Sequence, residues 1–173
     1  MGDKTQLLSF VLAAKLRPRS SIILGILFAT LANHFLAGTM GVWLASVLSA
    51  QLLRWIVAVS FFAFGAWALK PDKLEEDRSL GGASVFVTTL ITFFLVEMGD
   101  KTQLATVALA ARYHSLISVV LGTTLGMMIA NVPAVWVGAT LADRINMKVT
   151  RWVAAGLFVL LGIFALLAPT SGV

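Results

Sequence analysis

The sequence predicts an all-α integral membrane protein built from two inverted repeats of three transmembrane helices. This prediction depends on the composition, the spacing of apolar runs and an internal repeat. Of the 173 residues, 59% are hydrophobic and only 12% are charged, whereas a soluble domain is roughly half apolar and a quarter charged. A chain this short cannot bury so much apolar surface in its own core, so lipid must cover the rest.

Apolar runs separated by short polar breaks mark the expected helices. Most of these runs reach the roughly 20 residues that a helix needs to cross the hydrocarbon layer, and only the first is too short. Length alone does not say whether the longer helices tilt, kink or break. In chain order, the expected helices cover residues 7–14, 21–47, 52–69, 83–111, 116–142 and 149–167.

The chain contains an internal repeat with an offset of 97 residues, which places residues 1–7 on the identical residues 98–104. Each unit holds three helices, an odd number, so the second copy enters the membrane from the opposite side. Inverted repeats of this kind are common in secondary transporters. We therefore divide the chain into a first three-helix unit that is truncated at its N-terminal end (1–69), a charged loop (70–81) and a second three-helix unit (82–173).

The charges of the loops predict the orientation of the chain in the membrane. When the loops are assigned alternately to the two sides, nine Lys and Arg residues fall on one side and two on the other. The richer side is expected to be cytoplasmic, which places the 70–81 loop in the cytoplasm and both termini outside. We expect a multi-pass protein of the bacterial inner (plasma) membrane. The net charge of +5 is typical of cytoplasmic loops and indicates no nucleic-acid partner.

The densest polar cluster inside apolar sequence covers residues 97–103. On a continuous helix, Glu97 and Asp100 would be three residues apart and would share one face, and Gly99 would allow close approach or local opening. Carboxylate, hydroxyl and amide oxygens are ligands for hard cations such as calcium, magnesium and manganese. The cluster predicts a cation site, because charges inside the membrane are costly and often mark ion paths.

A structural alternative is an ion pair between Glu97 and Lys101, which are four residues apart. The duplication favours the ion path, because inversion brings two such motifs together near the midplane. With a complete motif in both copies, four carboxylates would face two ammonium groups. One divalent cation or two protons would balance the difference, which suggests exchange of metal for protons.

Other polar residues rank lower. Asn33 and Asn131 occupy near-equivalent positions in the two units, and they could supply amide oxygens to the site or bond between helices. His34 has no counterpart, since Val132 follows Asn131; an interfacial or helix-packing role is favoured over gating or proton handling. The repeated glycines are expected to be points of close helix packing: Gly25 with Gly122, and Gly65 with Gly162.

The motif Glu97-Met98-Gly99-Asp100-Lys101-Thr102, its partial copy Gly2-Asp3-Lys4-Thr5 and the two three-helix units resemble the GDT-one family of small cation/proton antiporters. This family belongs to the LysE superfamily of exporters and includes bacterial manganese exporters and Golgi manganese and calcium exchangers. The resemblance covers essentially the whole chain. It implies that the acids of both motifs bind the transported cation, namely Asp3, Glu97 and Asp100, with Thr5, Gln6, Thr102 and Gln103 as helpers. Further supporting residues are Lys4, Lys101, Asn33 and Asn131.

The first motif departs from the family pattern, because the position equivalent to Glu97 would precede Met1. We expect a misplaced start, with upstream codons in the same frame that encode further apolar residues ending in Glu. As written, the site has three carboxylates.

The leading functional prediction is export of a divalent cation, manganese or calcium, driven by proton entry, with no cofactor other than the transported ion. The alternatives are export of a small organic solute such as an amino acid, or a non-transporting assembly or scaffold role. An intramembrane enzyme is disfavoured, because the chain has two His, no Cys and no His–acid cluster along the sequence. The expected partners are the cation, protons and the lipid bilayer; the sequence leaves the oligomeric state and the choice between manganese and calcium open.

Overall fold

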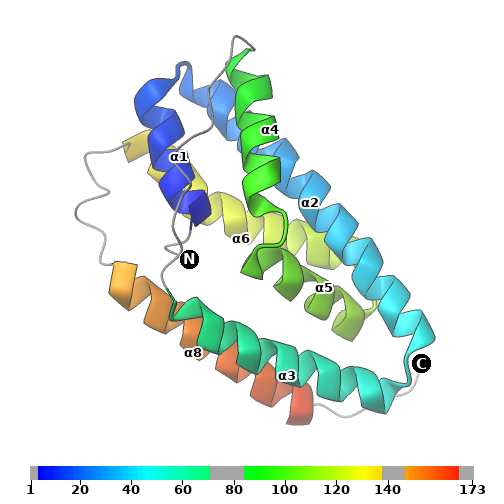
Figure 1. The fold of residues 1–173 in the computed structure, drawn as a ribbon. Coiled ribbons are helices and arrows are strands. Elements are labelled where there is room, and N and C mark those ends of the chain that lie inside the picture. Colours follow the sequence, from blue (N-terminus) through cyan, green and yellow to red (C-terminus); the bar gives the residue numbers. More distant parts are fainter. Residues whose placement is uncertain (1–3, 71–83, 138–146, 168–173) are drawn as a thin grey trace.

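The computed structural model describes residues 4–70, 84–137 and 147–167, and over these ranges it is helical, without a strand (Figure 1). The all-α class is therefore confirmed. Most of the 70–81 loop and the end of the helix expected at 116–142 lie outside the described residues. The helices are α1 (Lys4–Lys15), α2 (Arg19–Val47), α3 (Ala50–Ala68), α4 (Val85–Glu97), α5 (Lys101–Tyr113), α6 (Leu116–Val137) and α8 (Met147–Leu167).

The lengths and surfaces of the helices fit a membrane. Three of them are long and apolar enough to cross it: Arg19–Val47, Ala50–Ala68 and Leu116–Trp136. Val85–Glu97 and Arg151–Leu167 are shorter apolar helices. Many large apolar side chains face outward, which soluble proteins rarely allow in such number and which lipid accommodates. Those more than half exposed include Phe35, Trp43, Trp55, Val59, Leu125, Ile129, Trp152 and Leu160.

The apolar run at 83–111 is not one helix but two, α4 and α5, joined by a short break (Figure 1). Gly99 has a φ of 73°, a left-handed conformation that glycine adopts without steric cost and that commonly ends helices. Asp100 then caps α5, where its carboxylate accepts a hydrogen bond from the Thr102 amide at 3.4 Å. The expectation that Glu97 and Asp100 share a helical face is therefore wrong, because Glu97 ends α4 and Asp100 precedes α5.

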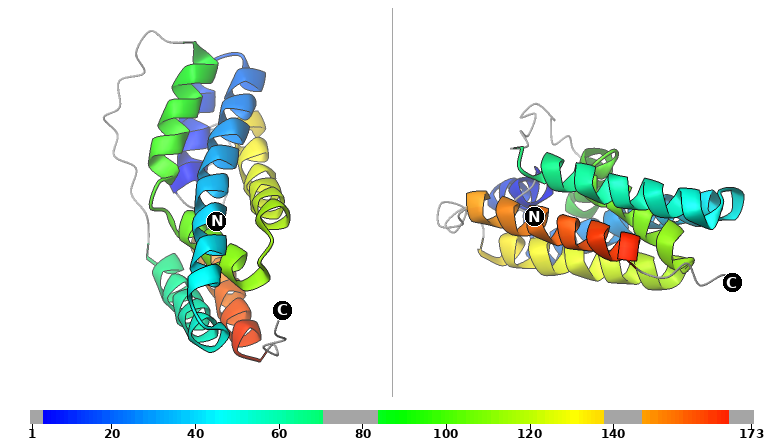
Figure 2. Two further views of the ribbon diagram at one scale, coloured as in Figure 1. Left: turned by 90° about the vertical axis from the view of Figure 1, so that its right-hand side faces the viewer. Right: turned by 90° about the horizontal axis from the view of Figure 1, so that it is seen from below.

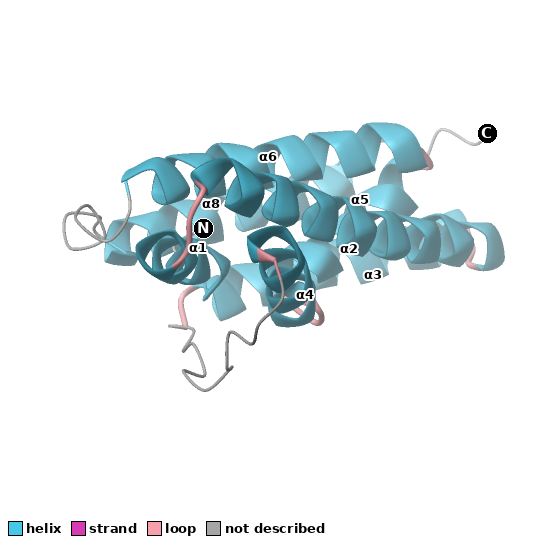
Figure 3. Cartoon of the chain, turned by 90° about the horizontal axis from the view of Figure 1, so that it is seen from above, coloured by secondary structure: helices cyan, strands magenta, loops and turns pink. Residues whose placement is uncertain are grey.

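The helices of the two halves interlock. α2 packs against α4, α5 and α6, whereas α1 packs mainly on α6 (Figures 1 and 2). α3 and α8 lie along each other, and α3 also contacts α5. The second motif, at the start of α5, thus packs on a helix of the first half, and α1 of the first half packs on a helix of the second. Figure 3 shows α4 nearly end-on while α6 runs across the view, so the helices are not all parallel.

Two apolar clusters fill the described core. The first joins α1, α2, α4 and α6 and includes Leu12, Ile22, Ile26, Phe93 and Val135. The second joins α3, α5 and α8 and includes Val57, Phe61, Ala108, Ala111 and Ala165. The core also holds buried polar side chains, which are unusual in apolar helices and need partners; among them are Asn33, His34, Glu97, Asp100, Lys101 and Asn131.

Three of the four repeated glycines are close-packing points, as expected. A methyl group on Gly25 would lie 2.7 Å from Thr89 Cβ, and those on Gly65 and Gly162 would also lie close to neighbouring helices. The expectation is wrong for Gly122, around which nothing lies within 4 Å in the described part of the chain. The side of α6 at Gly122 faces away from the other described helices.

Gly41 marks the tightest approach of α2 to α5. A methyl group there would overlap the carbonyl oxygen of Val107 and lie 2.8 Å from Ala110 Cβ. Gly41→Ala is therefore expected to destabilise the protein by about 1–3 kcal/mol, because the two backbones must separate. Thermal unfolding of the purified protein in detergent measures the effect. Gly156→Ala on α8 is the matched control, since no described residue lies within 4 Å of its methyl group and alanine favours helix. Equal unfolding midpoints for the two variants would contradict the prediction.

Candidate functional site

Two buried carboxylates flank the break between α4 and α5. Glu97 is the last residue of α4 and is 0% exposed, and Asp100 precedes α5 and is 1% exposed. Burying a charge is costly unless it is paired and hydrogen-bonded. The partners of these two groups therefore decide what the site can do.

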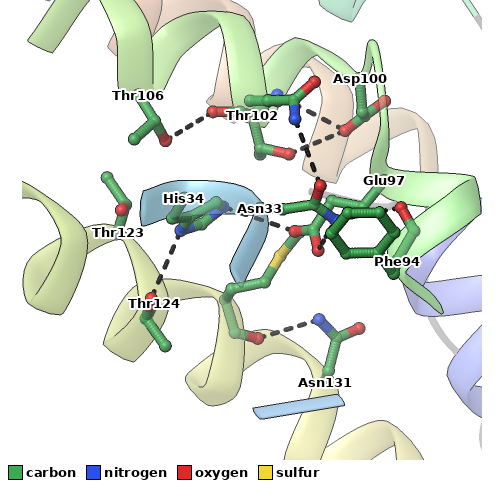
Figure 4. Close-up of polar contacts among 12 residues, drawn as sticks. Asn33, His34, Phe94, Glu97, Asp100, Thr102, Thr106, Thr123, Thr124 and Asn131 are labelled. Atoms are coloured by element: carbon green, nitrogen blue, oxygen red, sulfur yellow. Dashed lines mark hydrogen bonds and ion pairs between the residues drawn. The ribbon is translucent and has the colours of Figure 1, made fainter. Parts of the chain in front are cut away.

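Asn33 on α2 links both sides of the break (Figure 4). Its Nδ2 donates hydrogen bonds to the Phe94 carbonyl oxygen at 3.0 Å and to Glu97 Oε2 at 3.3 Å. Its Oδ1 accepts from Gln103 Nε2 at 3.3 Å, and Gln103 Oε1 accepts from the Gly99 amide at 2.7 Å. Of the two roles that the sequence left open for Asn33, bonding between helices is the one observed, and it orients the Glu97 carboxylate.

His34 faces the other oxygen of Glu97. Its Nε2 lies 3.4 Å from Glu97 Oε1, and its Nδ1 lies 3.5 Å from Thr124 Oγ1 on α6 (Figure 4). The ring is 1% exposed. The break in the helix removes the four-residue spacing that would pair Glu97 with Lys101, and the structure places His34 against Glu97 instead.

Asp100 joins the two copies of the motif. Its Oδ2 accepts a 2.8 Å hydrogen bond from Thr102 Oγ1, and its Oδ1 lies 3.5 Å from Lys4 Nζ, which comes from the first copy. Lys101 is also buried, with its Nζ 5.5 Å from the centre of the Trp67 ring on α3, a cation–π geometry.

The remaining predicted residues lie where α1 meets α6. Ser9 Oγ donates to Asn131 Oδ1 at 2.9 Å and is also 2.9 Å from the Thr5 carbonyl oxygen. Gln6 Nε2 donates to the Ala130 carbonyl oxygen at 3.4 Å. Asn131 therefore bonds between helices, as Asn33 does, but its hydrogen-bond partners among the described residues include no carboxylate.

Asp3, the third predicted carboxylate, lies outside the described residues. Within the described ranges, no group of three histidine or acidic side chains is placed to hold a metal ion. The described part of the site offers two carboxylates, a histidine and amide and hydroxyl groups. Oxygen-rich sets of this kind bind divalent cations when further oxygen atoms complete the coordination shell.

The structure brings His34, for which the sequence favours a packing role, into contact with Glu97 and with Thr124, a residue that the sequence does not single out. The sequence favours a packing role for His34 because the second unit has Val132 at the matching position. The available signal was its ionisable ring inside an apolar span, which marks a functional candidate by default. Thr124 gave no signal, because hydroxyl side chains are common at helix contacts in membranes.

Comparisons with known proteins identify the family. The family model described as "Divalent cation/proton antiporter GDT1" matches residues 1–76 and 85–172. A protein of Vibrio cholerae named "Putative manganese exporter" is 48% identical over 94% of this chain and 82% of its own length. No solved structure matches.

Plant relatives are more distant. "GDT1-like protein 5" of Arabidopsis thaliana is 27% identical over 99% of this chain and 91% of its own length. "GDT1-like protein 3" of Oryza sativa subsp. indica is 26% identical over 91% of this chain and 66% of its own length. These matches confirm the resemblance read from the motifs and the expectation of a transporter rather than an enzyme. The chain belongs to the GDT1 family of divalent cation/proton antiporters.

Proposed function

We propose that this protein exports a divalent metal cation, manganese, in exchange for protons, and that the carboxylates of Asp3, Glu97 and Asp100 bind the ion in transit. The observation that carries the proposal is the pair of buried carboxylates at the α4–α5 break. Broken helices form the substrate and ion sites of many secondary transporters, because an interrupted helix exposes polar backbone and places side chains near the midplane. Membership in a cation/proton antiporter family favours the cation over an organic solute.

The inverted-repeat arrangement is part of the same proposal. The contact between Lys4 and Asp100, at 3.5 Å, links the first motif to the second. The interlocked packing supports an approximate two-fold relation, since α5 packs on α2 and α1 packs on α6. An inverted pair would bring the two motifs together near the midplane, with both termini outside and the 70–81 loop in the cytoplasm.

Proton exchange follows from the charge of the site. A bound divalent cation neutralises carboxylates that would otherwise be buried and negative. When the ion leaves, protons are the available replacement, because a buried carboxyl group without a counter-ion favours its neutral form. Metal release and proton uptake are then linked steps at the same oxygen atoms.

Manganese uptake into inside-out vesicles tests this function. We expect uptake when the vesicle lumen is more acidic than the outside, and loss of that uptake when an ionophore collapses the gradient. Asp100→Asn is expected to abolish uptake, because it removes one charged ligand. Glu76→Gln, the same chemical change in the 70–81 loop, is the matched control and is expected to behave as wild type.

Two results would count against the proposal. Manganese uptake that does not depend on the proton gradient would refute the exchange of manganese for protons, but manganese transport itself would still stand. If the folded wild-type protein moves neither manganese nor calcium, the proposed function as a cation transporter is refuted.

A further inference from the structure

His34 is a buried base whose Nε2 makes no hydrogen bond with the described residues. Neither His34 Nε2 nor Glu97 Oε1 makes a hydrogen bond in the described part of the chain, although both are buried and lie only 3.4 Å apart. Buried polar atoms are nearly always satisfied. At 3.4 Å the two atoms form an ion pair only when the imidazole is protonated; with a neutral ring, they face each other as two lone-pair donors that a cation can bridge.

The spacing of the two atoms suits a shared cation. Two neighbouring ligands at right angles on a metal, with bonds of roughly 2.1 to 2.6 Å, lie roughly 3.0 to 3.7 Å apart. The observed 3.4 Å between Nε2 and Oε1 falls within that range. Asn33 occupies the other oxygen of Glu97 at 3.3 Å, so Oε1 is the oxygen left to bind an ion.

The other ring nitrogen of His34, Nδ1, faces the hydroxyl group of Thr124 on α6. Nδ1 lies 3.5 Å from Thr124 Oγ1, on the opposite side of the ring from Glu97 (Figure 4). A proton on Nδ1, donated to this hydroxyl, leaves the lone pair of Nε2 directed at Glu97. Metal-binding histidines usually have their other nitrogen fixed in this way.

We infer that His34 is the selectivity residue of the transport site, a nitrogen ligand that with Glu97 makes the site favour manganese-like transition ions over calcium and magnesium. The inference rests on the proposed function and decides between its two candidate ions. Calcium and magnesium take oxygen ligands almost exclusively, whereas first-row transition ions also bind imidazole. A site with one imidazole nitrogen therefore disfavours the alkaline-earth ions.

The nitrogen is present in only one half of the molecule. The near-equivalent residue of the second unit is Val132, which cannot bind a metal. An approximately symmetric pair of motifs would thus carry one asymmetric ligand.

Electron paramagnetic resonance of bound Mn²⁺ tests the inference directly. Pulsed measurements detect the nuclear modulation of a ¹⁴N atom that is bonded to the metal. The full chain has two histidines, His34 and His114, so a preparation with a histidine-free tag gives a clean readout. We expect imidazole modulation in the wild type and in His114→Gln, and its loss in His34→Gln, whose side chain is similar in reach but binds metals through oxygen.

Transport selectivity gives the second test, in proteoliposomes loaded with an indicator for Mn²⁺ or Ca²⁺. His34→Gln is expected to reduce the ratio of manganese to calcium transport by about tenfold or more, and His114→Gln to leave the ratio unchanged. Bound manganese without ¹⁴N modulation in the wild type, or an unchanged ratio in His34→Gln, would overturn the inference and leave the proposed function standing. If His34→Gln does not fold, the wild-type spectrum alone decides. A wild-type protein that moves neither ion would instead refute the proposed function.

Discussion

Glu97→Gln is expected to abolish manganese transport while leaving the protein at least as resistant to heat as the wild type. Glutamine keeps the size of the side chain and an oxygen atom that can accept the hydrogen bond from Asn33 Nδ2, now 3.3 Å from Glu97 Oε2. The substitution removes a negative charge from a side chain that is 0% exposed. A buried charge is costly to the fold, so its loss does not weaken the packing.

The same charge is what a divalent cation needs. In a site shielded from water, loss of one charged ligand is expected to weaken ion binding by about 100-fold or more. Initial rates of manganese uptake and thermal unfolding midpoints, measured on the same preparations, separate the two effects. Glu97→Asp keeps the charge but shortens its reach, and we expect intermediate transport. Wild-type transport by Glu97→Gln would exclude this carboxylate as an ion ligand.

Asn33→Ala is expected to be the most damaging change among the uncharged residues of the site. It removes the donor to Phe94 and Glu97 and the acceptor for Gln103. Hydrogen bonds between membrane helices contribute about 0.6 kcal/mol each on average, so the fold loses about 2 kcal/mol. Transport should fall by about tenfold or more, because Glu97 is no longer oriented.

Asn131→Ala is the matched control for Asn33→Ala, because the two asparagines occupy near-equivalent positions in the internal repeat. Asn131 bonds to Ser9 and to the Met127 carbonyl oxygen of its own helix, and no described carboxylate depends on it. Its replacement is expected to lower stability slightly with little change in the transport rate. The concentration dependence of manganese uptake distinguishes the variants. If both alanine variants impair transport equally, orientation of Glu97 by Asn33 is not what limits transport.

The helices could be predicted from the sequence more easily than the break between two of them. Apolar length identified α2, α3 and α8 within a few residues, because lipid-facing helices need little more than apolar side chains. The sequence leaves the break after Glu97 open, because α4 and α5 together form one long apolar run whose length does not show whether it is interrupted. Glycine followed by aspartate is nonetheless a local signal, since glycine favours the left-handed end of one helix and aspartate caps the next.

Some residues of the candidate site could be predicted from the sequence, and others could not. Duplication of the motif pointed to Asp100 and Lys4, and Glu97 was indicated by its place in the polar cluster at residues 97–103. The structure pairs Asp100 with Lys4 across the two copies. The repeat could not indicate His34, because a comparison of the two halves reveals only what they share. Its contact with Glu97 is a tertiary fact that depends on how α2 crosses the end of α4.

The interlocked helices bear on how the protein is made. Synthesis delivers α1, α2 and α3 first, when Asn33 and His34 on α2 have none of their partners from α4, α5 and α6. Polar groups without partners are expensive in hydrocarbon, so the newly inserted first half is an incomplete product that later helices must join. Because the second half is translated last, the first half can complete its folding only when α4, α5 and α6 pack against it.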